Sequence, residues 1–176
     1  MDTALQILAY TIPSLIVFLI TFFMVKAFFD KEYKLRLLEF REQQIRQSLP
    51  VRLQAYERLI LFMERISLNN LLPRVRQSEM TVAQFRAALI SNVNMEYEHN
   101  LSQQLYISPK TWEVVKAAKE EMKSIINRNA MELRPDASSI DLSKHIINKM
   151  AEQEEDTATQ KAILSLKQEV MMLYER

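Results

Sequence analysis

The hydrophobic pattern begins with one long apolar run, from Thr3 to Val25, that has the length of a membrane-spanning helix. Such a helix reaches roughly 35 Å at about 1.5 Å per residue, and the hydrocarbon core of a bilayer is about 30 Å thick. The run contains no charged side chain, and membrane helices tolerate a proline such as Pro13 as a kink. The pattern therefore predicts a transmembrane anchor over residues 1–25.

Basic and aromatic residues follow the apolar run closely, and they predict a membrane interface. These residues are Lys26, Phe28, Phe29, Lys31, Tyr33, Lys34 and Arg36. Basic residues are retained on the cytoplasmic side of membrane proteins, and aromatic residues collect at headgroup level. Asp2 is the only charged side chain before the run. We therefore expect a single-pass protein of the plasma (inner) membrane, with the N-terminus outside and the rest of the chain in the cytoplasm.

Two other interpretations of the run are less favoured. A signal peptide begins with basic residues and has an apolar segment of about 7–15 residues, whereas this run is longer and no basic residue precedes it. A pore would be lined by polar side chains, here Gln6, Thr11, Ser14 and Thr21. Because no ionisable side chain lies within the run, an anchor is favoured over a conduction path.

Residues 26–49 contain no helix breaker, and we expect the membrane helix to continue through them as a stalk. Apolar residues recur there at heptad-like spacing, at Leu35, Leu38, Ile45 and Leu49, with Glu42 interrupting the series. Fewer than three heptads favour a stalk that packs on its own domain over a coiled coil. Because the residue before a proline avoids the α-helical region, Pro50 predicts a helix break. A cytoplasmic helical domain is then expected over residues 50–176.

In that domain, apolar residues repeat at helical spacing between capping signals. One helix is expected over about residues 51–72, and a capping-box pattern at Thr81 and Gln84 opens a second to about residue 106. Ser108 and Pro109 begin a third, and a last stretch from residue 139 is interrupted near residues 152–156. The expected inward faces are Leu53, Tyr56, Leu59, Ile60, Phe62, Met63 and Ile66; Val82, Phe85, Leu89, Val93, Tyr97, Leu101 and Leu105; and Trp112, Val115, Ala118, Met122 and Ile125 or Ile126.

The composition supports an all-α fold. The chain has no glycine and few prolines, and it is rich in strong helix formers. Tight turns and phosphate-binding loops depend on glycine, so β-rich folds and glycine-based nucleotide motifs are disfavoured. Without cysteine, the chain can form neither a disulfide nor a cysteine-ligated metal site. The expected architecture is an N-terminal transmembrane helix, a stalk and a small cytoplasmic helical bundle.

The stretch from Leu49 to Val75, LPVRLQAYERLILFMERISLNNLLPRV, resembles a family of uncharacterised bacterial membrane proteins. Members of that family are small, carry one N-terminal span and have a helical cytoplasmic region. The resemblance extends over most of the chain. It implies the same topology and a bacterial inner membrane, and it implies no activity and no site residue.

Candidate catalytic and metal-ligating residues are sparse. Glu96 and His99 have the Glu-x-x-His spacing of di-iron bundle proteins, but His145 lacks the matching glutamate of a second motif. Basic residues such as Lys116 and Lys119 alternate with acids at ion-pair spacing, and the net charge is only +1. We therefore expect no metal, no cofactor, no small-molecule substrate and no nucleic acid.

These observations favour a non-enzymatic, membrane-tethered scaffold or adaptor that binds itself or another membrane or envelope protein. The candidate protein interface is an apolar seam near the C-terminus, formed by Ile163, Leu166, Val170 and Leu173. An accessory subunit of a larger secretion, transport or motility complex is the main alternative. A third interpretation is an enzyme whose acid and base come from helices distant in the sequence.

Overall fold

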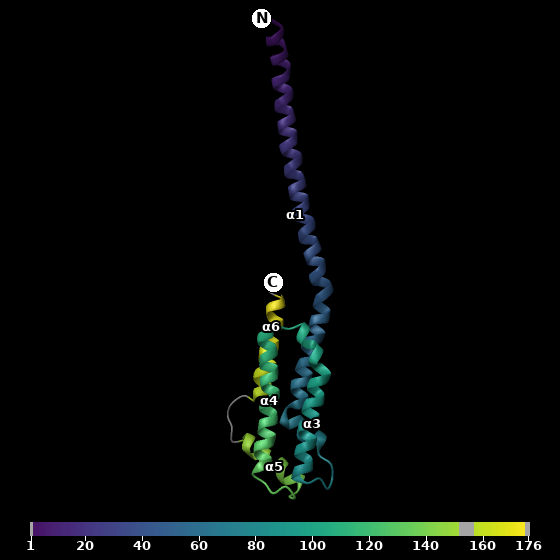
Figure 1. The fold of residues 1–176 in the computed structure, drawn as a ribbon, viewed down its shortest axis with the longest axis vertical. Helices are drawn as coiled ribbons and strands as arrows, with labels where there is room; N and C mark the ends of the chain where they lie inside the picture. The colour runs from purple at the N-terminus through teal and green to yellow at the C-terminus, as the bar shows by residue number, and fades with distance from the viewer. Residues whose placement is uncertain (1, 152–156, 175–176) are drawn as a thin grey trace. The chain divides into compact units, whose positions relative to one another are not determined.

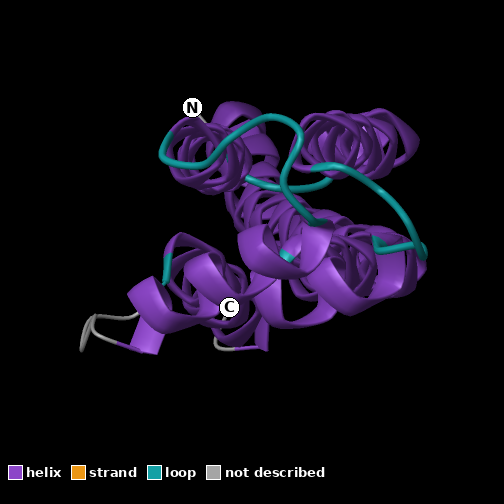
Figure 2. Ribbon diagram, turned by 90° about the horizontal axis from the view of Figure 1, so that it is seen from below, coloured by secondary structure: helices purple, strands orange, loops and turns teal. Residues whose placement is uncertain are grey.

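The computed structural model describes residues 2–151 and 157–174, and these residues are almost entirely helical (Figure 1). The α-helices are α1 (Asp2–Ile66), α2 (Leu68–Val75), α3 (Val82–Asn100), α4 (Pro109–Met131), α5 (Ser139–Ala151) and α6 (Ala158–Tyr174), with a 3-10 helix η1 (Leu101–Leu105). Figure 2 shows coiled helices joined by loops, and no strand occurs in the described part of the chain. The prediction of an all-α fold is confirmed. The predicted interruption at residues 152–156 lies outside the described residues.

The chain divides into two compact units, residues 1–49 and residues 50–176, called unit 1 and unit 2 below. Unit 1 consists of the N-terminal part of α1. Every residue from Thr11 to Val25 is exposed. Two hydroxyls in this run are satisfied within the helix, because Ser14 Oγ donates to the Thr11 carbonyl at 2.9 Å and Thr21 Oγ1 donates to the Val17 carbonyl at 2.8 Å.

The helix break predicted at Pro50 is wrong, since α1 continues without interruption to Ile66. A proline inside a helix removes one backbone hydrogen bond and crowds the carbonyl four residues earlier. Pro50 is exposed, so solvent can reach the carbonyl that loses its partner. The strong helix formers on both sides then continue the helix through this position.

The first part of unit 2 turns sharply at Ser67. The helix predicted over residues 51–72 instead ends at Ile66, and α2 continues through Pro73 to Val75. Asn70 stabilises the turn, because its Nδ2 donates to the Glu64 carbonyl at 2.9 Å. The turn aims the buried leucines of α2 at the same core as α1, and these residues are Leu68, Leu71 and Leu72, with Val75 at the end.

The predicted inward faces of α1, α3 and α4 form most of the core. On α1 the fully buried side chains include Tyr56, Leu59, Phe62, Met63 and Ile66. The capping box of α3 is present as predicted, and Ser108 Oγ accepts from the Thr111 N–H to cap α4. α4 packs against α3, α5 and α6.

The prediction for the end of the second inward face, on α3, was wrong. The α-helix stops at Asn100 and tightens into η1, which moves Leu101 and Leu105 off the inward stripe. Their side chains are 41% and 78% exposed. A 3-10 helix has three residues per turn, so residues spaced for the 3.6 residues per turn of an α-helix no longer fall on one side of it.

Backbone hydrogen bonds tie the start of α3 to the start of α5. The Val82 N–H donates to the Ala137 carbonyl at 2.8 Å, and the Ser139 N–H donates to the Met80 carbonyl at 2.9 Å. The turn that precedes α3 places Glu79 at φ 69°, in the left-handed region that glycine usually occupies. In a chain without glycine, a longer side chain adopts this conformation.

Candidate functional site

The predicted membrane-interface residues lie on unit 1, and all of them are exposed. They are Lys26, Phe28, Phe29, Lys31, Tyr33, Lys34 and Arg36. The rings of Phe28 and Phe29 meet edge to face with centroids 6.0 Å apart. Arg36 is held by Glu32 one turn earlier, with Nη2 and Oε1 2.9 Å apart. These side chains can therefore face headgroups, and their role at a membrane remains a prediction.

The predicted interface seam on α6 is occupied within the chain. Leu166 is completely buried, and Ile163, Val170 and Leu173 are partly buried against the same core. α6 lies along α4, which supplies Val115, Ala118 and Met122 to that core. The side of α6 that faces solvent carries Leu164, Met171 and Met172 instead.

The carboxylate of Glu169 joins three elements of unit 2. It accepts a hydrogen bond from Tyr56 Oη of α1 at 2.7 Å. It also accepts from the Ser108 backbone N–H and from Ser108 Oγ, both at 2.8 Å. Ser108 is the N-cap residue of α4. Glu169 of α6 therefore holds the N-cap of α4 and a tyrosine of α1 through the same carboxylate. Both carboxylate oxygens therefore accept hydrogen bonds from within unit 2.

The surroundings of this carboxylate shift two pKa values in opposite directions. Burial raises the pKa of Glu169, but hydrogen bonds from Thr111, Tyr56 and Ser108 stabilise the anion and lower the pKa overall. Burial, together with the hydrogen bond and the charge of Glu169, raises the pKa of Tyr56 to about 12. At neutral pH the pair is therefore a neutral phenol that donates to a carboxylate.

We expect the substitution Glu169→Gln to destabilise unit 2 by about 1–3 kcal/mol at neutral pH, because hydrogen bonds to a charged group are lost. Since the pKa of Glu169 is lowered on folding, its contribution is complete above the ordinary carboxyl pKa of 4.5 and is lost as the pH falls through the folded value. Urea unfolding at a series of pH values should show the two proteins converging in acid. A difference that stays constant down to acid pH would contradict this assignment.

On the alkaline side, we expect the stability of the wild-type protein to fall between pH 10 and about 12. The pKa of Tyr56 is raised from 10 to about 12 on folding, so the contribution of the protonated phenol is complete below pH 10 and is lost above it. The variant Tyr56→Phe, which has no proton to lose, should lack this part of the pH dependence. Equal alkaline curves for the two proteins would exclude a buried phenol as the cause.

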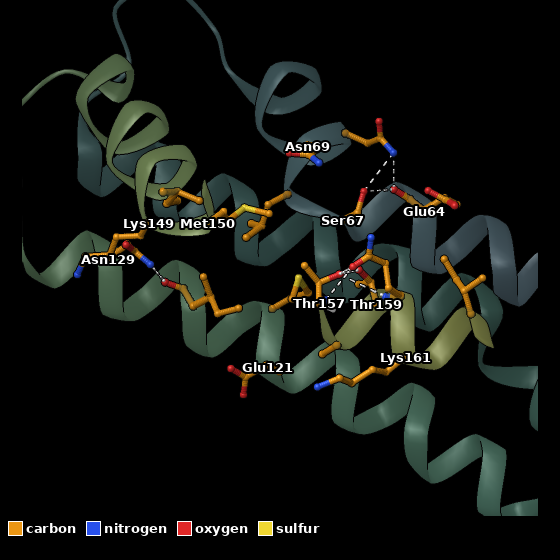
Figure 3. A pocket seen from close by; sticks show the side chains of 18 of the residues that line it. Glu64, Ser67, Asn69, Glu121, Asn129, Lys149, Met150, Thr157, Thr159 and Lys161 are labelled. Carbon is orange, nitrogen blue, oxygen red and sulfur yellow. Dashed lines mark hydrogen bonds between the residues drawn. The ribbon is translucent and has the colours of Figure 1, made fainter. Parts of the chain in front are cut away.

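A cavity of about 950 Å³ lies in unit 2 between the Ser67 turn, the middle of α4, the end of α5 and the start of α6 (Figure 3). Its apolar lining comes from Leu68, Met122, Ile125, Ile146, Met150 and Ile163. Among the described side chains, Asn129 Oδ1 is the one buried nitrogen or oxygen atom without a hydrogen-bond partner. Asn129 Nδ2 donates to the Ile125 carbonyl at 2.8 Å, so this oxygen is left as an acceptor in the wall.

Two charged side chains in the cavity lining have acidic partners. Arg128 pairs with Glu121, with 3.6 Å between Nη2 and Oε1, and Lys149 pairs with Glu132. The lining also includes Glu64, Glu121 and Lys161, so it contains both acidic and basic side chains.

Comparison with protein-family models matches residues 2–173 to a family of unknown function, DUF7935. The chain belongs to this family. The match covers unit 1 together with nearly all of unit 2, so both belong to the family's common sequence. No curated protein and no solved structure matches the chain.

The two histidines of this DUF7935 chain lie in different surroundings. His99 is exposed, and its motif partner Glu96 forms ion pairs with Arg65 at 2.6 Å and Arg74 at 3.5 Å. His145 Nε2 lies 2.9 Å from Glu132 Oε2. In the described part of the chain, no group of three or more histidine or acidic side chains could hold a metal ion.

Sequence reasoning missed both Glu169 and Asn129. Glu169 lies 113 positions from Tyr56 and 61 from Ser108. No local pattern marks such a partner. The one available signal was the polar Glu169 next to Val170 on the inward side of an amphipathic helix, where an acid needs a hydrogen-bond donor.

Proposed function

We propose that this protein is a single-pass membrane scaffold whose helical domain, residues 50–176, presents an interaction surface at the cytoplasmic face. In this proposal residues 3–25 span the plasma (inner) membrane of a bacterium, with the N-terminus outside. Lys26, Lys31 and Lys34 lie near the cytoplasmic headgroups, where each basic residue contributes about 1 kcal/mol of attraction to anionic lipid. Unit 2 is then a compact helical bundle attached by the stalk.

The observation that carries the proposal is the exposure of the apolar run from Thr11 to Val25. The helix contains a strongly hydrophobic stretch near the N-terminus, and none of that stretch is buried. The side chains of Phe18, Ile20 and Phe23 are each more than 60% exposed. In water, such a surface would cost about 25 cal/mol for each Å² of apolar area. A lipid bilayer removes that cost along the full length of the run.

The proposal includes no catalytic activity. It is supported by two partly buried acids that are engaged in hydrogen bonds and ion pairs within the fold. Glu169 caps α4, and Glu96 neutralises Arg65 and Arg74. Enzyme sites instead concentrate groups of perturbed pKa around an accessible cleft. The exposed apolar side of α6, with Leu164, Met171 and Met172, is more typical of a surface that binds protein.

Single cysteines test the topology directly, because the chain has none of its own. We would compare Asp2→Cys, Phe18→Cys and Gln47→Cys in right-side-out spheroplasts treated with a membrane-impermeant maleimide. We expect the first variant to react in intact spheroplasts, the third to react only after lysis, and the second to react only in denaturing detergent. Recovery in the soluble fraction, or equal labelling of all three, would overturn the proposal.

A further inference from the structure

The stalk carries apolar side chains that the membrane does not cover if residues 3–25 span it. Leu35 and Leu38 are 50% and 60% exposed. At about 1.5 Å per residue they lie roughly 15–20 Å beyond Val25, whereas the headgroup region adds only about 5–8 Å on each side of the hydrocarbon core. These leucines therefore stand in water unless protein covers them.

Some of the charged side chains beside these leucines form ion pairs within the helix, and others do not. Glu32 pairs with Arg36 and Glu42 pairs with Arg46 within the same helix, at 2.9 and 2.7 Å. Lys34 precedes Leu35 and Glu39 follows Leu38, and neither forms an ion pair within the described parts of the chain. A basic and an acidic side chain thus flank the same apolar stripe.

We propose that a second copy of this chain packs in parallel along the stripe formed by Leu35 and Leu38. With these leucines at heptad positions a and d, Lys34 takes position g and Glu39 the following position e. In a parallel pair, g of one helix faces the next e of the other, so Lys34 of each copy meets Glu39 of its partner. The next a position is Glu42, which ends the apolar stripe and places the two Glu42 side chains opposite each other. Arg41 of one copy lies beside Glu42 of the other, and Arg46 at the next e position pairs with Glu42 of its own helix.

The inference rests on the proposed membrane span, because so short a stripe does not by itself hold two copies together. One a and d pair falls short of the three or four heptads that are typical of a coiled coil. Anchoring in one membrane holds every copy parallel, brings identical residues to the same depth and raises the effective concentration of the partner. On α6, Leu166 is buried in the core of unit 2, and Ile163, Val170 and Leu173 are partly buried against it.

Cysteine crosslinking in native membranes tests the contact. Four single-cysteine variants are compared. Leu35→Cys has Leu37→Cys as its control, and Leu38→Cys has Phe40→Cys, because two residues along a helix turn the side chain by about 200°. All four side chains are between 39% and 60% exposed, so all four cysteines are accessible to an oxidant. We expect disulfide dimers from the Leu35 and Leu38 positions only. Equal yields at all four positions, or dimers from Leu37 and Phe40 alone, would overturn the proposal.

A charge exchange supplies the second test, in the Leu38→Cys background. Lys34→Glu alone and Glu39→Lys alone should each lower the crosslinked fraction by about fivefold, because each places like charges across the contact. The double variant Lys34→Glu/Glu39→Lys should restore it. A double variant no better than the single ones would reject the proposed pairing. The impermeant-maleimide assay on the same membranes reports the span independently, so a failed contact is distinguished from a failed anchor.

Discussion

The variant Leu166→Glu should strongly destabilise unit 2, whereas Leu164→Glu, two residues earlier on the same helix, should leave its stability almost unchanged. Leu166 is completely buried and Leu164 is 49% exposed. Removing a buried leucine costs about 2–5 kcal/mol, and burying a carboxyl group without a partner adds to that cost. We expect a loss of about 4 kcal/mol or more, against a total stability of about 5–15 kcal/mol for a domain.

The single tryptophan provides the measurement. Trp112 is buried and stacks on Tyr97 with ring centroids 5.6 Å apart, so its fluorescence reports the folding of unit 2 in the full-length protein in mild detergent. Urea unfolding should shift to much lower concentrations for Leu166→Glu. For Leu164→Glu, the free energy of unfolding should change by no more than about 0.5 kcal/mol, as is usual for surface positions. Similar curves for both variants would mean that α6 does not pack as described.

The two sides of α6 differ in what a substitution there can report about partner binding. A glutamate at Leu166 would weaken assembly by destabilising the domain, so a loss of assembly in that variant would not report an interface. Substitutions at Leu164, Met171 and Met172 change the exposed side of α6 and leave the core intact. These positions are therefore the ones at which a loss of partner binding would be informative.

If residues 3–25 span the membrane, as proposed, two arginines in the middle of the apolar run should remove the protein from it. The translocon-based cost of one arginine at the centre of a membrane helix is about 2.5–3.5 kcal/mol, so Leu15→Arg with Leu19→Arg should cost about 5–7 kcal/mol. The two positions are one helical turn apart and both side chains are exposed. Neither arginine therefore gains a partner inside unit 1.

Carbonate extraction followed by sedimentation measures the effect. The wild-type protein should remain in the membrane pellet, and the double variant should be found in the supernatant or be degraded. The matched control is Leu105→Arg with Met131→Arg, because both side chains are 78% exposed in unit 2. That control should stay in the pellet. If the variant with arginines in the apolar run also stayed there, the run would not be a membrane span.

Much of the local structure could be predicted because it depends on neighbouring residues. The capping box at Thr81 and Gln84 and the cap at Ser108 are read from a few adjacent positions, and both are present. The inward faces of α1 and α4 follow from a repeat of three and four residues. Where the local rule changes, as at Pro50 and at Asn100, prediction of the helix ends failed.

By itself, the sequence determined the all-helical fold and the apolar run, because periodicity, capping and hydrophobicity are local properties. The tertiary structure decided how those faces are used. On α6, packing against α4 places Leu166 in the core and leaves Ile163, Val170 and Leu173 partly buried against it. Likewise, Glu169 became the link between α1, α4 and α6 only when folding brought Tyr56 and Ser108 to it. Such partners are distant along the chain, and their selection depends on how the helices pack together.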